Sequence, residues 1–358
     1  MAESTPVLER DVPTTRAEAG NLEQLLLQFA TGYFPCAALW IAAELNVADL
    51  IGPGGAPVSE LAAKTGTNED ALFRMLRLLA MVGIFKESEP RRFSLTPSAE
   101  LLRSDHPQSM RDTVLWLADP FHLKTAAELL HSVRTGQPTI QHVTGKGAFE
   151  YFSTDQLEFD RFHRAMTNLS AMAINAALEA YDFSAYKTIV DLGGGHGFAI
   201  CSILRKYPHM QGILFDLADI VPGADARIRE LGLESRCRTT SGNFFESVPE
   251  GGDVYFMKHI LHDWTDEQAS TILQNCRRVM KNGTGGQTVS KIVLLELVVP
   301  PGNEPHPSKI IDIEMLMLPG GRERMENEWR DLFAGAGFRL TRVIPTKSPF
   351  CVIEAELA

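Results

Sequence analysis

The chain has 358 residues, of which 44% are hydrophobic and 22% charged, so it is long enough for two globular domains and is not a disordered protein. A net charge of -11 disfavours a nucleic-acid partner, because binding to phosphates depends on Lys and Arg. The five cysteines form no CxxC pair and no cluster at zinc-ligand spacing, so the sequence predicts neither a disulfide framework nor a metal site.

Residues 1–20 are polar and are expected to form a flexible tail without the basic and apolar regions of a signal peptide. The most apolar early stretch, FPCAALWIAAEL, is too short to cross a bilayer. We therefore expect a cytoplasmic protein with no membrane partner.

Residues 21–105 are expected to form one helical domain. Apolar residues at three- and four-residue spacing begin near Leu22 and predict two helices, with a break or kink at Pro35. These long apolar helices exceed what one small domain can bury, so we expect a homodimer.

The second half of this domain has the pattern of a helix-turn-helix followed by a charged hairpin, which is a winged helix. One helix is expected to be capped by Ser59 and to end at Gly66, and the next to be capped by Thr67 or Asn68 and to end at Gly83. The second helix carries few basic residues, so a packing or dimerisation role is favoured over DNA binding.

Residues 106–180 stay helical and rich in aromatic residues, and are expected to form a linker that contributes to a substrate pocket. Over residues 181–358, short apolar strands alternate with amphipathic helices, which predicts an α/β fold with a Rossmann-like, doubly wound parallel sheet. The last two strands are close enough in sequence to form an antiparallel hairpin at the sheet edge.

A glycine-rich turn, VDLGGGHG, follows the first of these strands and opens a helix. Gly193 and Gly195 have no side chains, which lets a ligand approach the backbone closely. Asp216 ends the next strand, where its carboxylate can accept hydrogen bonds from the ribose of NAD or of S-adenosylmethionine. The alternative is that Asp216 only caps the following helix.

Two further stretches follow later strands, at the carboxyl edge where open sheets bind ligands. The amide of Asn243 can form a hydrogen bond with the edge of an adenine ring, and the side chain of Phe244 can cover the face of that ring. His262, in HDW, can act as a general base for a hydroxyl group, because the ordinary imidazole pKa of about 6.5 leaves much of it neutral. Taken alone, a His-Asp pair at a helix start is more often a cap than a catalyst.

The motifs DLGGGHG, FDL, GNFF, FMKHILHDWTDE and GGRER together resemble the S-adenosylmethionine-dependent small-molecule O-methyltransferases. That family includes plant caffeate-type enzymes and bacterial enzymes that tailor aromatic polyketides and phenazines. The resemblance covers the chain after the tail. It implies a winged-helix dimerisation domain, S-adenosylmethionine as cofactor with S-adenosylhomocysteine as product, and a small aromatic substrate.

The resemblance also implies roles for individual residues. His262 corresponds to the family's general base, flanked by acids that correspond to Glu296 and Glu323. Met166 and Met315 match positions in the substrate pocket. The expected cofactor-binding residues are Gly193, Gly195, Asp216, Leu217, Asn243, Phe244 and Lys258.

Two departures from the family pattern bear on the site. Asn243 replaces the usual aspartate, and His259 adds a second imidazole. The expected activity is methyl transfer to a hydroxyl of an aromatic acceptor. The alternatives are a relative that keeps the cofactor without methylating (a hydroxylase, decarboxylase or cyclase), a winged-helix regulator that senses a small molecule, and an NAD oxidoreductase.

Overall fold

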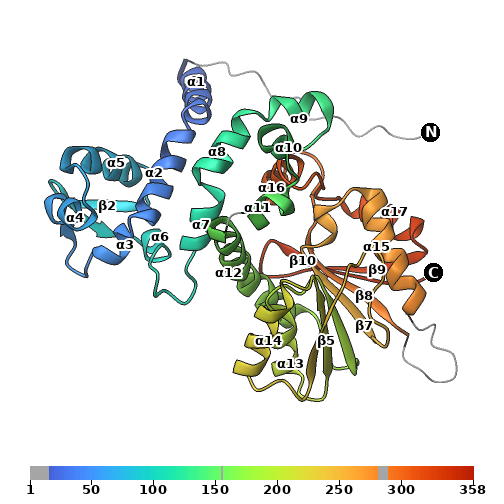
Figure 1. The fold of residues 1–358 in the computed structure, drawn as a ribbon. Coiled ribbons are helices and arrows are strands. Elements are labelled where there is room, and N and C mark those ends of the chain that lie inside the picture. The colour runs from blue at the N-terminus through green and yellow to red at the C-terminus, as the bar shows by residue number, and fades with distance from the viewer. Residues whose placement is uncertain (1–15, 155, 281–288) are drawn as a thin grey trace. The chain divides into compact units, whose positions relative to one another are not determined.

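The computed structural model describes the backbone of residues 16–154, 156–280 and 289–358 (Figure 1). Contacts divide the chain into two compact units, Met1–Leu123 and Lys124–Ala358, and each is described by itself. Most of the expected tail over residues 1–20 lies outside the described residues, and the first helix begins at Arg16. The domain boundaries expected at residues 105 and 180 stay predictions.

The N-terminal unit combines helices with a small three-stranded sheet of order β1-β3-β2. Its elements are α1 (Arg16–Ala30), α2 (Tyr33–Glu44), α3 (Val47–Leu50), β1 (Ala56–Pro57), α4 (Val58–Thr65), α5 (Glu69–Met81), β2 (Phe85–Glu89), β3 (Arg92–Leu95), α6 (Pro97–Glu100) and α7 (Arg111–Leu117).

The winged helix is confirmed by α4, α5 and the antiparallel hairpin of β2 and β3. Gly66 ends α4 with a left-handed φ of 67°, and Asn68 caps α5 by accepting a hydrogen bond from Ala71 N. The expected cap at Ser59 is wrong, because α4 already begins at Val58, before that residue. Pro57 occupies the N-cap position without a side-chain cap.

Helices α1 and α2 meet at a bend of 47° that precedes Pro35. Pro35 lies in the first turn of α2, where its missing N–H leaves no helical bond unmade. No single described helix is long and apolar enough to cross a membrane, although Leu22–Ala30 and Tyr33–Glu44 pass that test as a bent pair. This segment exposes several large apolar side chains, including Leu26, Leu27 and Phe29.

The C-terminal unit contains the large sheet and its covering helices; α8 (Pro120–Ala127) runs across the boundary between the units. The other elements are α9 (Leu130–Thr135), α10 (Thr139–Thr144), α11 (Ala148–Thr154), α12 (Gln156–Ala180), β4 (Thr188–Leu192), α13 (Phe198–Lys206), β5 (Gln211–Asp216), α14 (Val221–Glu230), β6 (Cys237–Ser241), β7 (Val254–Lys258), the 3-10 helix η1 (Leu261–Asp263), α15 (Asp266–Val279), β8 (Lys291–Leu297), α16 (Ser308–Met317), α17 (Glu326–Gly335), β9 (Phe338–Pro345) and β10 (Phe350–Leu357).

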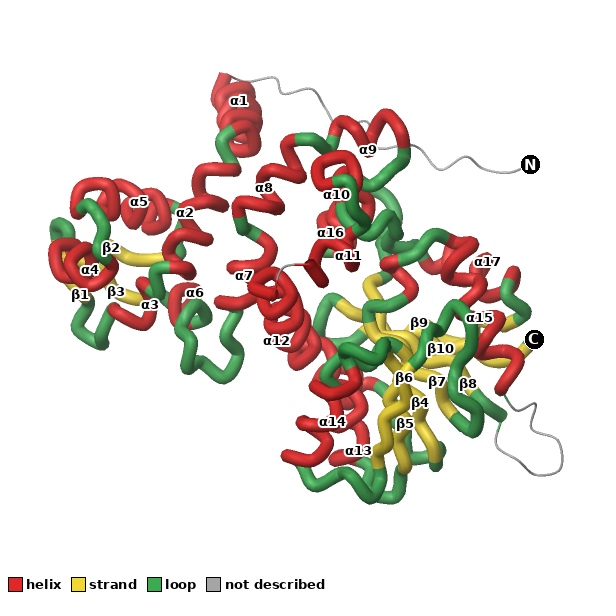
Figure 2. The backbone as a smooth tube through the Cα atoms, in the orientation of Figure 1, coloured by secondary structure: helices red, strands yellow, loops and turns green. Residues whose placement is uncertain are grey.

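The seven strands have the order β6-β5-β4-β7-β8-β10-β9 and form a single twisted sheet (Figure 2). Strands β4 to β8 pair in parallel, as the alternation of strands and helices predicts. The final hairpin is confirmed at the sheet edge: β10 pairs antiparallel with both β8 and β9, and β9 is outermost.

Alternate side chains of the central strands enter two hydrophobic cores, one on each face of the sheet. On β7, Val254 and Phe256 pack with helices α12, α13 and α14, whereas Tyr255 and Met257 pack with α15 and α17. Burial on both faces explains the continuous apolar runs of these strands. Because β4 to β8 are parallel, the residues that follow them meet at one edge of the sheet, which holds the candidate site.

Candidate active site

The loop after β4 is shaped by glycines in the left-handed backbone region. Gly193 has a φ of 68°, which disfavours any other residue, and a Cβ there would lie 2.4 Å from Ile260 Cδ1 and would have to displace the end of that side chain. Gly195 has a φ of 54°, and the space beside it is open, since a Cβ there would meet no atom within 4 Å. A ligand can therefore approach the loop backbone at Gly195.

Asp216, at the end of β5, fixes this loop. Its Oδ2 accepts a hydrogen bond from Gly195 N and its Oδ1 accepts one from Leu217 N, both at 2.7 Å. Helix α14 begins at Val221, so Asp216 does not cap it and that alternative is wrong. Burial raises the pKa of Asp216. Leu217 beside it is 54% exposed, which leaves an apolar side chain free to cover a ligand.

Asp191 is a buried carboxylate beneath the loop that sequence reasoning missed. Its Oδ2 has no hydrogen-bond partner among the described residues, and burial raises its pKa to about 7, against the opposing charge of Lys258. An acid inside the apolar strand TIVDL was the available signal. The unpartnered Oδ2 of Asp191, the open space beside Gly195 and the carboxylate of Asp216 together suit a ligand that carries hydrogen-bond donors, such as ribose hydroxyls or an ammonium group.

Asn243 and Phe244 follow β6, as expected. Asn243 Oδ1 accepts a hydrogen bond from Phe245 N at 3.0 Å, so part of its amide is used within its own turn. The Phe244 ring would lie 3.8 Å from a Cβ on Gly193 and packs with Trp264 at 6.0 Å between ring centroids. The structure thus brings Phe244 next to the glycine loop.

Lys258 ends β7, and His259 directly follows it. Burial lowers the pKa of both, and the charge of Lys258 lowers that of His259 further. His259 has a left-handed φ of 54°, and its ring centroid lies 5.6 Å from that of His262. Its Nε2 has no hydrogen-bond partner among the described residues, while Nδ1 faces Lys258 Nζ at 3.5 Å. His259 is therefore held neutral beside the site.

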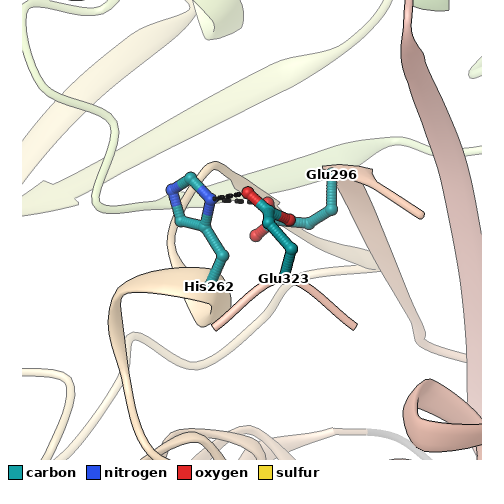
Figure 3. A group of neighbouring side chains, drawn as sticks. All are labelled: His262, Glu296 and Glu323. Carbon is teal, nitrogen blue, oxygen red and sulfur yellow. Dashed lines mark hydrogen bonds and ion pairs between the residues drawn. The ribbon is translucent and has the colours of Figure 1, made fainter. Parts of the chain in front are cut away.

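His262 lies on η1, directly after β7, and points at two acids from distant parts of the chain (Figure 3). Its Nδ1 is 2.7 Å from Glu323 Oε1 and 3.7 Å from Glu296 Oε2. Since a carboxylate can only accept, Nδ1 carries the hydrogen and Nε2 is the basic nitrogen of the neutral ring. The structure thus brings together the three residues that the resemblance assigns to acid-base chemistry.

Glu296 also holds the turn that carries His262. Its Oε1 accepts hydrogen bonds from Ile260 N at 3.0 Å and Leu261 N at 3.1 Å. Its Oε2, like Glu323 Oε2, is buried without a hydrogen-bond partner among the described residues. Glu296 Oε2 lies 3.7 Å from His262 Nδ1, so its negative charge stabilises a positive imidazole ring.

The electrostatics of His262 differ from those of an ordinary imidazole. Burial lowers its pKa, but the charges of Glu296, Glu323 and Asp263 outweigh burial and raise the pKa. Asp263 Oδ1 lies 3.5 Å from Nε2. The expectation of a mostly neutral ring near pH 7 is therefore wrong, because the sequence did not reveal three carboxylates around one imidazole. Burial raises the pKa of Glu296 as well.

The ligand atoms of His262, Glu296 and Glu323 lie within 4.8 Å of one another, which is also close enough to hold a metal ion. The short Nδ1 to Glu323 bond instead forms the base and orienting-acid pair of a proton-transfer site. The arrangement can accept a proton at Nε2 and stabilise the imidazolium that results.

Glu323 lies in the GGRER segment, between α16 and α17. Its N–H donates to Asp312 Oδ1 at 2.8 Å, and Arg324 forms a parallel bridge with Val298, just past β8. Met315 is buried on α16, and its carbonyl accepts a hydrogen bond from Gly320 N at 2.8 Å. Met166 is half-buried on α12, and its contact with a substrate stays a prediction.

Comparison with known proteins identifies the family of the chain. The sequence matches the O-methyltransferase domain over residues 127–339 and the O-methyltransferase dimerisation domain over residues 27–105. The chain belongs to the O-methyltransferase family. Membership decides between the two adenosyl cofactors that the glycine loop left open: the chain is an S-adenosylmethionine-dependent O-methyltransferase.

Three relatives illustrate the likeness. Phenazine O-methyltransferase PhzM of Lysobacter antibioticus is 41% identical to this O-methyltransferase, over 95% of this chain and 98% of the relative. The structure of CalO1, a methyltransferase in calicheamicin biosynthesis, in its SAH-bound form, is 35% identical with a TM-score of 0.84, over 97% and 100%. The 8-amino-8-demethylriboflavin N,N-dimethyltransferase of Streptomyces davaonensis is 30% identical, over 96% and 98%.

Proposed function

We propose that this O-methyltransferase methylates a hydroxyl group on a flat aromatic acceptor of secondary metabolism, with His262 as general base. The single observation that supports this most directly is the 2.7 Å bond between His262 Nδ1 and Glu323, which leaves Nε2 as the proton acceptor. Met166 and Met315 are proposed to line the acceptor pocket, where soft apolar side chains suit an aromatic ring.

We propose that the cofactor is held by Gly193, Gly195, Asp216, Leu217, Asn243, Phe244 and Lys258. When bound, S-adenosylmethionine supplies a methyl group on a positively charged sulfur. The open space beside Gly195 admits the ligand to the loop backbone. Asp216 accepts hydrogen bonds from the ribose, and Phe244 covers the adenine.

The role of His262 is to remove the acceptor's hydroxyl proton as the oxygen attacks. The proton moves to Nε2, and the imidazolium is stabilised by Glu323 and Glu296, whose carboxylates lie 2.7 Å and 3.7 Å from Nδ1. A general base contributes about 10²- to 10⁴-fold, roughly 3–5 kcal/mol, whereas alignment of the two reactants contributes about 7–11 kcal/mol. His262 is therefore expected to matter strongly without accounting for the whole rate.

Because the pKa of His262 is raised, its role as general base depends on pH. The base form is the deprotonated ring, so the active fraction rises with pH. A phenolic acceptor has a pKa of about 10. Transfer of its proton to an imidazole whose pKa is raised costs less free energy than transfer to an ordinary imidazole.

A radiolabelled methyl donor tests the activity. The enzyme would be incubated with hydroxylated phenazines and naphthols and, separately, with the corresponding amino compounds. The amino compounds are included because one relative is named as an N,N-dimethyltransferase. Label transferred to oxygen supports the proposal, and label confined to nitrogen contradicts it. Binding of S-adenosylmethionine without any transfer would instead favour the non-methylating hydroxylase, decarboxylase or cyclase alternative.

We also propose a homodimer formed through the N-terminal domain. The dimerisation-domain match starts at residue 27, and Leu26, Leu27 and Phe29 are exposed apolar side chains on α1. Sedimentation of the intact protein at micromolar concentration tests this, and a monomer would contradict it. The division at residues 20, 105 and 180 and the cytoplasmic location are kept as proposals, which limited proteolysis and cell fractionation test.

A further inference from the structure

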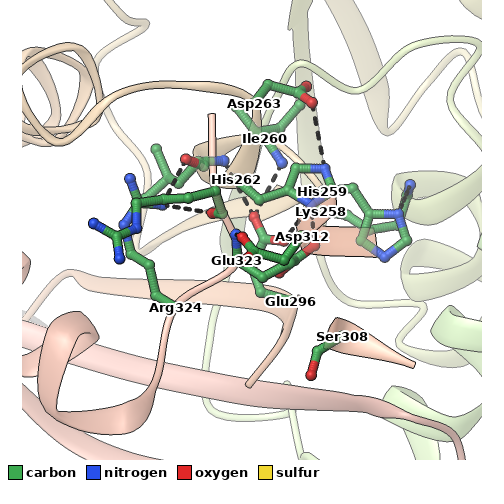
Figure 4. A network of polar contacts seen from close by, with 12 residues as sticks. Lys258, His259, Ile260, His262, Asp263, Glu296, Ser308, Asp312, Glu323 and Arg324 are labelled. Carbon is green, nitrogen blue, oxygen red and sulfur yellow. Dashed lines mark hydrogen bonds and ion pairs between the residues drawn. The ribbon is translucent and has the colours of Figure 1, made fainter. Parts of the chain in front are cut away.

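Arg324 is a fully buried cation beside the turn that carries His262 (Figure 4). Its guanidinium donates through Nη1 to Leu261 O and through Nη2 to Trp264 O, each at 2.9 Å. These two carbonyls stand immediately before and immediately after His262 and Asp263. One rigid, planar group therefore spans the base-carrying turn.

The remaining contacts of the guanidinium fix its own position. Nε donates to Asp266 Oδ1 at 2.9 Å, at the start of α15, and the charge lies 5.1 Å from the centre of the Trp329 ring. The side chain of Asp266 is 55% exposed, so this ion pair is partly solvated. The two buried carbonyl contacts are the ones that bear on His262.

The backbone next to Arg324 presses against the same turn. A Cβ on Gly321 would lie 1.9 Å from His262 O and 2.4 Å from the carbonyl carbon of Asp263, so only glycine fits. Arg322 N donates to His262 O at 2.8 Å. The segment Gly321 to Arg324 thus holds the turn by its backbone and by one side chain, while Glu323 within it binds the imidazole.

We propose that Arg324 is a positioning residue for methyl transfer: its guanidinium clamps the carbonyls of Leu261 and Trp264 and thereby aligns His262 Nδ1 with Glu323. This inference rests on the proposed role of His262. Because Glu323 and Arg324 are adjacent in the chain, one short segment sets both the acid that orients the base and the turn from which the base projects. A shift of about 1 Å in such a group can lower a rate 100-fold.

The test is Arg324→Lys, which keeps the charge but replaces the planar fork by one ammonium that cannot hold both carbonyls. We expect kcat to fall about 10- to 100-fold while KM for S-adenosylmethionine changes less than about 3-fold. We also expect the acid limb of the kcat–pH profile to move to lower pH, because a loosened imidazole gains less from the carboxylates. Arg330→Lys on α17 is the matched control, since Arg330 forms an exposed pair with Glu326 at 2.8 Å.

If Arg324 were merely structural, Arg324→Lys would lower the active fraction equally at every pH and leave the acid limb of the kcat–pH profile in place. That outcome would overturn the inference, and so would an unchanged kcat. Gly321→Ala provides a second route, because it displaces the same turn without altering any charge, and it decides the matter if Arg324→Lys does not fold. For Gly321→Ala we expect the same loss of kcat, while calorimetry should show that the variant still binds S-adenosylmethionine. Retained activity in His262→Gln would refute the proposed function itself, whereas an inactive His262→Gln with a normal Arg324→Lys refutes only the clamp.

Discussion

The glycine loop at residues 193–197 and the base turn Leu261–Asp263 lie at the same sheet edge but are built on different principles. Backbone conformation shapes the loop: three of its glycines have positive φ, and Asp216 fixes it with one hydrogen bond. Buried charge shapes the base turn, with Glu296, Glu323 and Arg324 arriving from other segments. We infer that damage to the loop weakens binding, whereas damage to the turn weakens chemistry.

The largest expected effect is a loss of kcat without a loss of cofactor binding, which separates the function of the base turn from that of the glycine loop. His262→Gln removes the base but retains a side chain of similar size. We expect kcat to fall about 10²- to 10⁴-fold, because the proton acceptor is lost, while the calorimetric Kd for S-adenosylmethionine stays within about 3-fold. A comparable loss of cofactor affinity would mean that the two regions do not act separately.

The next effect tests the loop. Gly193→Ala places a Cβ 2.4 Å from Ile260 Cδ1 at a positive φ, so we expect a roughly 10- to 100-fold weaker Kd for the cofactor as the loop shifts. Gly232→Ala is the control, because Gly232 has a φ of 65° but no neighbour within 4 Å. The control should lose about 1 kcal/mol of unfolding free energy and no affinity. Equal affinities for both variants would contradict the role of the loop.

A smaller effect concerns pH. The carboxylates raise the pKa of His262, so activity should fall as pH drops through that value. Glu296→Gln removes a negative charge and keeps an oxygen for the Ile260 and Leu261 N–H groups, so the acid limb should move to lower pH by about one unit, equivalent to 1.36 kcal/mol. A kcat/KM–pH profile checks this, and an unmoved limb would show that the limb belongs to another group.

The same raised pKa affects stability. The folded chain binds the His262 proton more tightly than the unfolded chain does, whose imidazole pKa is about 6.5. This contribution is complete below that pH and is lost as the pH rises through the folded-state pKa. Urea unfolding of the parent chain and His262→Gln at pH 6 and pH 9 should show the difference between them shrinking at the higher pH.

The smallest expected effect is at Asn243. Asn243→Asp restores the family's usual acid and keeps the oxygen that accepts from Phe245 N, but it places a like charge near Glu246, whose Oε1 is 3.4 Å from Asn243 Nδ2. These changes oppose each other, so we expect the cofactor Kd to change less than about 3-fold, as measured by calorimetry. A 10-fold gain would indicate that adenine recognition depends on a charge at this position.

Local patterns in the sequence predicted most of the fold. Alternating strands and helices indicated the parallel sheet, and Asn68 and Gly66 marked helix ends correctly. The expected cap at Ser59 was wrong for a local reason, since Val58 already begins α4. The break expected near Pro35 is present, but it lies just before the proline, which fits the first turn of α2. Such errors move an element boundary by a few residues and leave the topology intact.

The site was less accessible to sequence reasoning because its interactions join distant segments. Glu296 and Glu323 came from the family resemblance, since one lies in an apolar strand and the other in a loop rich in glycine and arginine. Arg324 and Asp191 were missed, because their importance depends on burial. The raised pKa of His262 was missed for the same reason: three carboxylates had first to be placed around the ring.

A backbone bridge between Val298 and Arg324 joins the two segments that carry the acids beside His262. Val299 N donates to Arg324 O at 3.0 Å, so the strand that bears Glu296 is tied by peptide hydrogen bonds to the segment that bears Glu323. The spacing of the two acids is then fixed by backbone hydrogen bonds between the end of β8 and the loop that carries Glu323. Catalytic competence should persist up to the main melting transition and vanish together with it, instead of fading beforehand through local fraying.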